Sequence, residues 1–215
     1  MVTHYIHRGL AKKNFKENTL RAFKYSFKKN YGIETDLHAT KDNQIICFHD
    51  FTLKRKFKLN KKIKEINYHE LKKISKKKKN EIPLLKNLLK ISKNRQSLLL
   101  EIKPLLQKKN LLQLVKLTKN TKKYGLISFK EKNLINLHKI NNKLPLGLLF
   151  NATAKFKTIQ LKAIKKYVKF LVLEKKFLLN KSIHLIEKKI YYYTIKNKDL
   201  FKKYKNSKNL IFENL

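Results

Sequence analysis

Short apolar runs alternate with amphipathic segments along most of this 215-residue chain. The runs are close to continuously hydrophobic, which is typical of strands buried on both faces, and the segments between them repeat apolar residues at helical spacing. The predicted strands are residues 3–7, 33–40, 98–103, 124–129, 146–150, 170–173, 189–195 and 210–212. The predicted helices are residues 19–29, 68–78, 83–93, 111–119, 132–140, 159–167, 178–186 and 199–204. Strands and helices in this alternation predict an α/β fold, a (β/α)8 TIM barrel that occupies residues 1–215 as a single domain.

The second predicted strand continues into a β-hairpin. Residues 44–49 form another β-branched and aromatic run, and Asp42-Asn43 between the two runs has turn chemistry. A two-residue turn there pairs residues whose numbers sum to about 85, which places His49 opposite Asp36 and diagonal to Glu34. The hairpin is thus a short extension after the second barrel strand. Earlier in the chain, Asn18 is the expected N-cap of the first helix.

Acidic residues are scarce, and several fall where barrel chemistry is expected. The chain has 14 Asp and Glu residues, and four of them lie in one short stretch: Glu34, Asp36, Asp42 and Asp50. Because active sites of (β/α)8 barrels form at the C-terminal ends of the strands, the candidates are His7, Arg8, Glu34, Asp36, Glu101, Lys103, Ser128, Tyr193 and Thr194. Three of them, Glu34, Asp36 and Glu101, predict an oxygen-rich site for Mg²⁺ or Ca²⁺. The alternative is a solvated face with scattered charges.

The net charge of +40 bears on partners more than on the fold. Arg occurs only at positions 8, 21, 55 and 95, so the other 50 basic residues are lysines, spread over almost every segment. Specific nucleic-acid interfaces usually rely on Arg for bidentate contacts, so we expect no specific nucleic acid and interpret the lysines as codon bias of an A/T-rich genome. At low salt we expect non-specific attraction to polyanions and weak attraction to anionic membrane surfaces. The pattern leaves the oligomeric state open.

The single cysteine, Cys47, lies in an apolar run, which excludes an internal disulfide and predicts a buried thiol. No segment approaches the roughly 18 apolar residues of a membrane span, and the N-terminal residues lack a basic and apolar leader. A soluble cytoplasmic protein is expected.

Taken in order, the chemistry-bearing residues resemble a known family. The motifs are His7-Arg8-Gly9, Glu17-Asn18-Thr19, Ala22-Phe23, Gly32-Ile33-Glu34-Thr35-Asp36, Thr40-Lys41-Asp42, His49-Asp50, Leu53-Lys54-Arg55, Ile82-Pro83-Leu84-Leu85, Leu100-Glu101-Ile102-Lys103 and Ser128-Phe129. Their order and spacing resemble the glycerophosphodiester phosphodiesterase family, whose fold is a barrel of this type. The resemblance covers essentially the whole chain. It implies a metal-dependent hydrolase that converts glycerophosphodiesters to sn-glycerol 3-phosphate and an alcohol such as choline or ethanolamine.

The resemblance also implies roles for individual residues. It implies that Glu34, Asp36 and Glu101 hold the divalent metal. His7 and His49 are implied as the general acid-base pair. We assign His7 as the general base and His49 as the general acid, with water or the glycerol 2-hydroxyl of the substrate as nucleophile.

The substrate contacts implied are those of Arg8 and Lys103 with the phosphate and of Tyr193 with the glycerol carbons. Glu17 orients His7 or Arg8, or else is only a charge at a helix start. His38, on the face of Asp36, is a further candidate for lining the site.

The resemblance weakens toward the C-terminus. The seventh strand of the family usually reads Trp-Thr-Val-Asn, whereas residues 193–196 are Tyr-Thr-Ile-Lys, and the Thr-Asp of the last strand is replaced by Phe212-Glu213-Asn214. Lys196 in place of Asn leaves the substrate preference open. Two alternatives therefore stand beside the main prediction: a lysophospholipase D that acts on lysophospholipids, and an inactive basic barrel that binds polyanions.

Overall fold

A closed parallel barrel organises the computed structural model, which describes residues 2–215. Among these residues, nine strands form one sheet, and eight of them close into the barrel in the order β1, β2, β4, β5, β6, β7, β8, β9, with β1 paired to both β2 and β9. The bounds are β1 Tyr5–His7, β2 Gly32–Ala39, β3 Ile45–Cys47, β4 Leu98–Ile102, β5 Tyr124–Ser128, β6 Leu146–Phe150, β7 Phe170–Glu174, β8 Lys189–Ile195 and β9 Asn209–Phe212. The predicted (β/α)8 barrel is confirmed.

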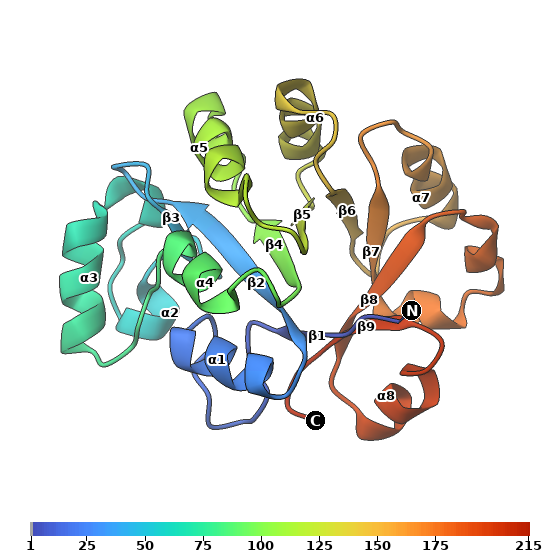
Figure 1. Cartoon of the computed structure of the whole chain (residues 1–215), viewed down its shortest axis with the longest axis horizontal. Helices are drawn as coiled ribbons and strands as arrows, with labels where there is room; N and C mark the ends of the chain where they lie inside the picture. Colours follow the sequence, from blue (N-terminus) through green and yellow to red (C-terminus); the bar gives the residue numbers. More distant parts are fainter. Residues whose placement is uncertain (1) are drawn as a thin grey trace.

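Helices surround the barrel and bury the outward face of its strands (Figure 1). The α-helices are α1 Leu20–Lys28, α2 Lys54–Phe57, α3 Tyr68–Lys77, α4 Leu85–Ser92, α5 Lys108–Thr118, α6 Glu131–Ile140, α7 Phe156–Ala163 and α8 Lys198–Tyr204. The 3-10 turns are η1 Ile63–Glu65, η2 Lys175–Leu179 and η3 Lys181–Leu185. None of the described helices is long and apolar enough to cross a membrane.

Alternation along each strand divides its side chains between an outer core and the barrel interior. The outer core lies between strands and helices, and the interior is filled by Tyr5, Leu99, Ile127, Leu149, Phe170, Val172, Tyr191 and Ile211. Because side chains two residues apart share a face, the next inward positions towards the C-terminal ends include His7 after Tyr5, Glu101 after Leu99 and Tyr193 after Tyr191. The apolar layer therefore closes the bottom of the barrel and leaves polar residues at its mouth.

The hairpin after β2 is present, but its register differs from the prediction by one residue. β2 and β3 pair Leu37 with Cys47 and His38 with Ile46, and the amide of Phe48 donates to the carbonyl of Asp36. The turn contains three residues, because Asn43 adopts a left-handed φ of 61° and its amide bonds the carbonyl of Thr40. The prediction that His49 lies opposite Asp36 is therefore wrong.

Two helix predictions also need correction. Thr19, whose hydroxyl accepts from the amide of Ala22, caps α1, whereas Asn18 has a φ of 58° and lies outside the helix. Residues 178–186 are not one helix, because they lie in the 3-10 turns η2 and η3, which meet at Asn180. The Asn180 side chain accepts from the amide of Ser182 and so offers the backbone a turn instead of a continued helix.

Candidate active site at the barrel mouth

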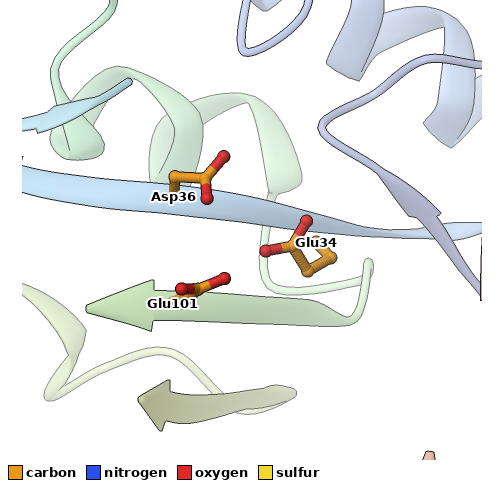
Figure 2. A group of neighbouring side chains, drawn as sticks. All are labelled: Glu34, Asp36 and Glu101. Carbon is orange, nitrogen blue, oxygen red and sulfur yellow. The ribbon is translucent and has the colours of Figure 1, made fainter. Parts of the chain in front are cut away.

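Three buried carboxylates from neighbouring strands meet at the mouth of the barrel. Glu34 and Asp36 are two residues apart on β2, and the β2–β4 register places Asp36 directly beside Glu101. Each offers an oxygen, and these atoms lie within 4.8 Å of one another. Figure 2 shows the three side chains converging from the two strands. The structure thus assembles the predicted oxygen-rich cluster.

The electrostatics of this cluster favour a cation. Burial, reinforced by the neighbouring carboxylates, raises the pKa of Glu34 well above its ordinary value and that of Glu101 to about 7. Burial also acts to raise the pKa of Asp36, but Arg8 and Lys103 outweigh it and hold the pKa below its ordinary value. Asp36 Oδ1 is buried and accepts no hydrogen bond from the described residues. The site offers hard oxygen donors, the three carboxylates repel one another, and Asp36 Oδ1 is an unused acceptor. These properties fit a divalent cation such as Mg²⁺ or Ca²⁺.

Two cationic side chains flank the carboxylates. Arg8 follows β1, and its Nε lies 3.2 Å from Asp36 Oδ2. Lys103 follows β4, and its Nζ lies 2.9 Å from Glu101 Oε1 and 3.5 Å from Asp36 Oδ1. Both side chains are mostly buried, so their charges act in a poorly screened environment. They offer positive charge to an anionic group beside the carboxylates.

The two predicted catalytic histidines line one cavity at the barrel mouth, together with Glu34 and Glu101. The Nδ1 atom of each ring contacts a carboxylate. His7 ends β1, with Nδ1 2.5 Å from Glu213 and Nε2 3.9 Å from Glu34. His49 comes from the loop after β3, with Nδ1 2.7 Å from Asp50. Burial lowers the pKa of His49 below its ordinary value, although the charge of Asp36 and the hydrogen bond to Asp50 oppose this. In both rings Nε2 is left for other partners.

The cavity has a volume of about 340 Å³ and both polar and apolar walls. Its lining residues are His7, Arg8, Glu34, His49, Glu101, Lys103, Ile127, Phe129, Leu149, Val172, Tyr193, Thr194, Lys196 and Ile211. The rings of Tyr193 and Phe129 meet edge to face at 6.2 Å, and the Tyr193 hydroxyl donates to the carbonyl of Phe150. An anion near Arg8 and Lys103 would therefore have an aromatic wall within the same cavity.

Glu17 belongs to a charged network behind the cavity. Its carboxylate lies 3.0 Å from Arg8 Nη1 and 3.2 Å from Lys56 Nζ, and it also contacts Arg55, which in turn pairs with Asp50. Burial acts to raise the pKa of Glu17, but the three cations outweigh it and lower the pKa to about 2. Of the two expected partners of Glu17, the structure thus places Arg8 in contact with it.

His38 and Ser128 lie outside the cavity lining. His38 is buried and its Nε2 lies 3.2 Å from the carbonyl of His49, so it contacts the backbone of the loop that carries His49. The Ser128 hydroxyl donates to the carbonyl of Ile102 and joins β5 to β4.

Two residues of the site were not predicted as such. Asn18 is buried and donates from Nδ2 to Asp36 Oδ2 at 2.9 Å, and Glu213 contacts His7. Glu213 follows the last apolar run, so its place at the end of a barrel strand was the available signal. Asn18 stands in the family motif Glu17-Asn18-Thr19, but the sequence predicted only a helix cap there, because its contact with β2 depends on the left-handed backbone before α1.

The fold and the residues at the barrel mouth define the class of protein. It is a (β/α)8 barrel with a buried carboxylate cluster, two cationic side chains and two imidazoles at its mouth. Residues 7–209 match the model of the Glycerophosphoryl diester phosphodiesterase family. The chain belongs to this family, as the motifs predicted.

Curated relatives match about a third of the chain. Lysophospholipase D GDPD1 of Homo sapiens is 42% identical over 69 residues, which are 32% of this chain and 22% of the relative. A glycerophosphodiester phosphodiesterase of Bacillus altitudinis is 37% identical over 73 residues, which are 34% of this chain and 29% of the relative. The matched stretches thus span less than a third of these relatives.

Solved structures share the fold over the whole chain. A glycerophosphodiester phosphodiesterase from Thermotoga maritima has a TM-score of 0.84 and 22% identity, with coverage of 100% of this chain and 95% of that one. A phosphodiesterase from Oleispira antarctica, in complex with the product sn-glycerol-3-phosphate, has a TM-score of 0.81 and 21% identity, with coverage of 99% and 92%. At these identities the likeness is one of fold.

Proposed function

We propose that residues 1–215 act as one domain that hydrolyses glycerophosphodiesters to sn-glycerol 3-phosphate and an alcohol, with Mg²⁺ or Ca²⁺ held by Glu34, Asp36 and Glu101. The observation that carries this proposal is a cluster of three buried carboxylates, two of which line one cavity together with two imidazoles, in a chain of this family. The product bound to the structural neighbour from Oleispira antarctica agrees with the proposed substrate class.

The substrate is an anion that gains charge during the reaction. A phosphodiester carries one negative charge, and attack on phosphorus adds charge to the non-bridging oxygens. Arg8 and Lys103 stand beside the carboxylates and stabilise that charge in a poorly hydrated site. When bound, the divalent cation supplies further positive charge to the phosphate. Tyr193 packs against the glycerol carbons.

The two histidines divide the proton transfers. His7 Nε2 accepts the proton of the attacking hydroxyl, which belongs to water or to the glycerol 2-hydroxyl of the substrate. Attack by the 2-hydroxyl gives a cyclic phosphate, which water must then open to yield sn-glycerol 3-phosphate. As the bond from phosphorus to the alcohol oxygen breaks, His49 donates a proton to that oxygen. Glu213 and Asp50 hold the two rings by their Nδ1 atoms, which directs each Nε2 away from these carboxylates.

The first test is hydrolysis of glycerophosphocholine and glycerophosphoethanolamine by the purified chain with and without EDTA. We expect turnover with Mg²⁺ or Ca²⁺, loss in EDTA and return on adding the cation. Cation at about 100 times its Kd should also stabilise the fold by about 2.7 kcal/mol, which thermal unfolding measures without any activity. Glu101→Gln should reduce both effects.

The histidine roles are tested by His7→Ala and His49→Ala. Each should lower kcat by at least about 100-fold, because positioned proton transfer contributes about that much. His69→Ala is the matched control, because His69 is exposed on α3 and should leave kcat unchanged. Turnover by His49→Ala at the wild-type rate would rule out its proposed role.

A lysophospholipase D is the second candidate activity. The human relative carries that name, and Phe129, on the cavity wall, leaves 40% of its surface exposed where an acyl chain could pack. Rates on lysophosphatidylcholine and glycerophosphocholine separate the two candidates. Faster turnover of the lysophospholipid, lost in Phe129→Ser, would favour the second.

A further inference from the structure

The seam where the barrel closes brings the two ends of the described chain together at the mouth. Parallel pairing places Ile6 beside Phe212 and, across the next strand, Ile195 beside Phe212. The residues that follow these partners are His7 on β1, Glu213 after β9 and Lys196 after β8. Three neighbouring strands thus present a histidine, a carboxylate and an ammonium in one row.

The row is joined by two short contacts through Glu213. Its Oε2 lies 2.5 Å from His7 Nδ1, and its Oε1 lies 2.6 Å from Lys196 Nζ. The Glu213 side chain is only 8% exposed, whereas that of Lys196 is 63% exposed. Both oxygens of a buried carboxylate are therefore occupied, one by the histidine and one by a lysine from the rim.

The backbone of Glu213 is fixed on both sides. Its amide donates to the carbonyl of Ile195 at 3.0 Å, and the amide of Asn214 donates to the carbonyl of Leu10 at 2.8 Å. Burial acts to raise the pKa of Glu213, but the hydrogen bonds from His7 and Lys196 outweigh it and lower the pKa to about 2. At neutral pH this group is a carboxylate that accepts hydrogen bonds and donates none.

We infer that Glu213 is a positioning residue that holds His7 with Nδ1 protonated and Nε2 free to accept a proton, and that Lys196 holds Glu213 in place. An acceptor on Nδ1 selects the tautomer that leaves a lone pair on Nε2, which is the form a general base requires. Glu213 is not among the residues that line the cavity, so it acts through His7. This inference rests on the proposed role of His7.

Glu213→Gln is the direct test, with the 215-residue chain, bound divalent cation and glycerophosphocholine. The amide keeps the size of the side chain but loses the charge, and its NH₂ group can donate to Nδ1 and favour the opposite tautomer. We expect kcat to fall at least about tenfold with KM changed less than about twofold. Nitrogen-15 NMR of labelled histidines, with His7 assigned by His7→Gln, should show Nδ1 protonated in the neutral ring of the wild type and protonation moving to Nε2 in Glu213→Gln.

Lys196 provides a second, surface-located variant. Lys196→Gln should lower kcat by a smaller factor and leave KM unchanged, and Lys196→Arg should restore kcat. If Lys196→Gln raises KM and spares kcat, the lysine binds substrate directly and its positioning role is wrong.

Glu131→Gln is the matched control. Glu131 also accepts from a lysine, Lys162, at 2.6 Å and contacts the hydroxyl of Tyr167, but it lies on α6 outside the cavity lining. It should change neither kcat nor the nitrogen-15 signals of His7. A Glu213→Gln protein with wild-type kcat, or with an unchanged His7 tautomer, overturns the inference. Absence of hydrolysis by the wild-type protein would instead contradict the proposed function. The NMR measurement of the His7 tautomer does not depend on hydrolysis.

Discussion

The pairing of Asp50 with His49 predicts a specific pH response. Burial lowers the pKa of His49, and the hydrogen bond from its Nδ1 to Asp50 opposes that shift. Asp50→Asn removes this contribution and leaves that of the Asp36 charge, so the pKa falls further and less of the His49 ring is protonated at pH 7. If His49 is the general acid, the alkaline limb of the kcat profile moves to lower pH, and kcat at pH 7 drops at least about tenfold. Initial rates between pH 5 and 9 measure this.

Asp50→Glu is the companion variant. It keeps the charge, so the alkaline limb should stay nearer that of the wild type. A limb that moves to higher pH in Asp50→Asn would contradict the assignment of His49 as the acid.

Of two adjacent residues before α1, one contributes to the carboxylate site and the other to the stability of the helix. Asn18 donates to Asp36 and accepts from the hydroxyl of Thr35 at 2.7 Å, whereas Thr19 caps the helix. Asn18→Ala leaves buried polar groups without partners, so we expect a loss of about 1–3 kcal/mol in stability together with weaker cation binding. Thr19→Ala should cost about 1 kcal/mol with cation binding unchanged. Urea unfolding and calorimetric titration with Mg²⁺ or Ca²⁺ measure the two effects, and equal cation affinity in both variants would contradict this assignment.

At the residue scale, the strand ends were informative because barrel geometry brings them together whatever the loops do. Glu34, Asp36 and Glu101 were found from their places two apart on one strand and near the end of the next. The contact between His7 and Glu213 joins residues 206 positions apart, and only barrel closure sets that distance. Periodicity reports which face a residue occupies and carries no such information about its partner.

At the scale of elements, close packing inside the barrel limits the size of the side chains where β6 meets β7. A Cβ atom added to Gly147 on β6 would lie 2.3 Å from the ring of Phe170 on β7. Phe170 is buried and its ring meets Tyr191 edge to face at 5.6 Å, which restricts its movement. Gly147→Ala should therefore destabilise the fold by about 1–3 kcal/mol by urea unfolding.

The cause is tested by a double-mutant cycle. Phe170→Leu alone should also destabilise, because it removes buried ring atoms. Combined with Gly147→Ala it should cost less than the sum of the two single changes, since the smaller side chain relieves the clash. Strict additivity would contradict the packing explanation.

Elements with unbroken periodicity were predicted well, and those that depend on local side-chain hydrogen bonds were not. The strand at residues 146–150 matches β6 with both bounds unchanged. The hairpin register failed because Asn43 adopts a left-handed conformation that adds a residue to the turn. The apolar pattern of residues 178–186 also suits a helix, but the Asn180 side chain ends the first turn there. Polar side chains that bond their own backbone compete with periodicity at such points.

At the scale of the whole molecule, charge is distributed unevenly. The chain has 54 basic and 14 acidic residues, and six of the acids stand in or behind the site: Glu17, Glu34, Asp36, Asp50, Glu101 and Glu213. Most other segments carry lysines with few acids to offset them. A surface of this kind attracts anions from a distance, whereas the site concentrates the fixed negative charge that a cation requires.

This distribution predicts how polyanions affect the enzyme. Heparin or DNA at low ionic strength should coat the lysine-rich surface and slow hydrolysis of a small glycerophosphodiester. Because the Debye length falls from about 30 Å at 0.01 M to about 8 Å at 0.15 M salt, the inhibition should fade steeply with added NaCl, while hydrolysis without polyanion changes little. Dextran, a neutral polymer, is the control for viscosity and crowding. Tight binding of one nucleic acid that survives moderate salt, in a protein without EDTA-sensitive turnover, would instead support the inactive polyanion-binding barrel. The salt dependence thus distinguishes a consequence of lysine content from a selected binding function.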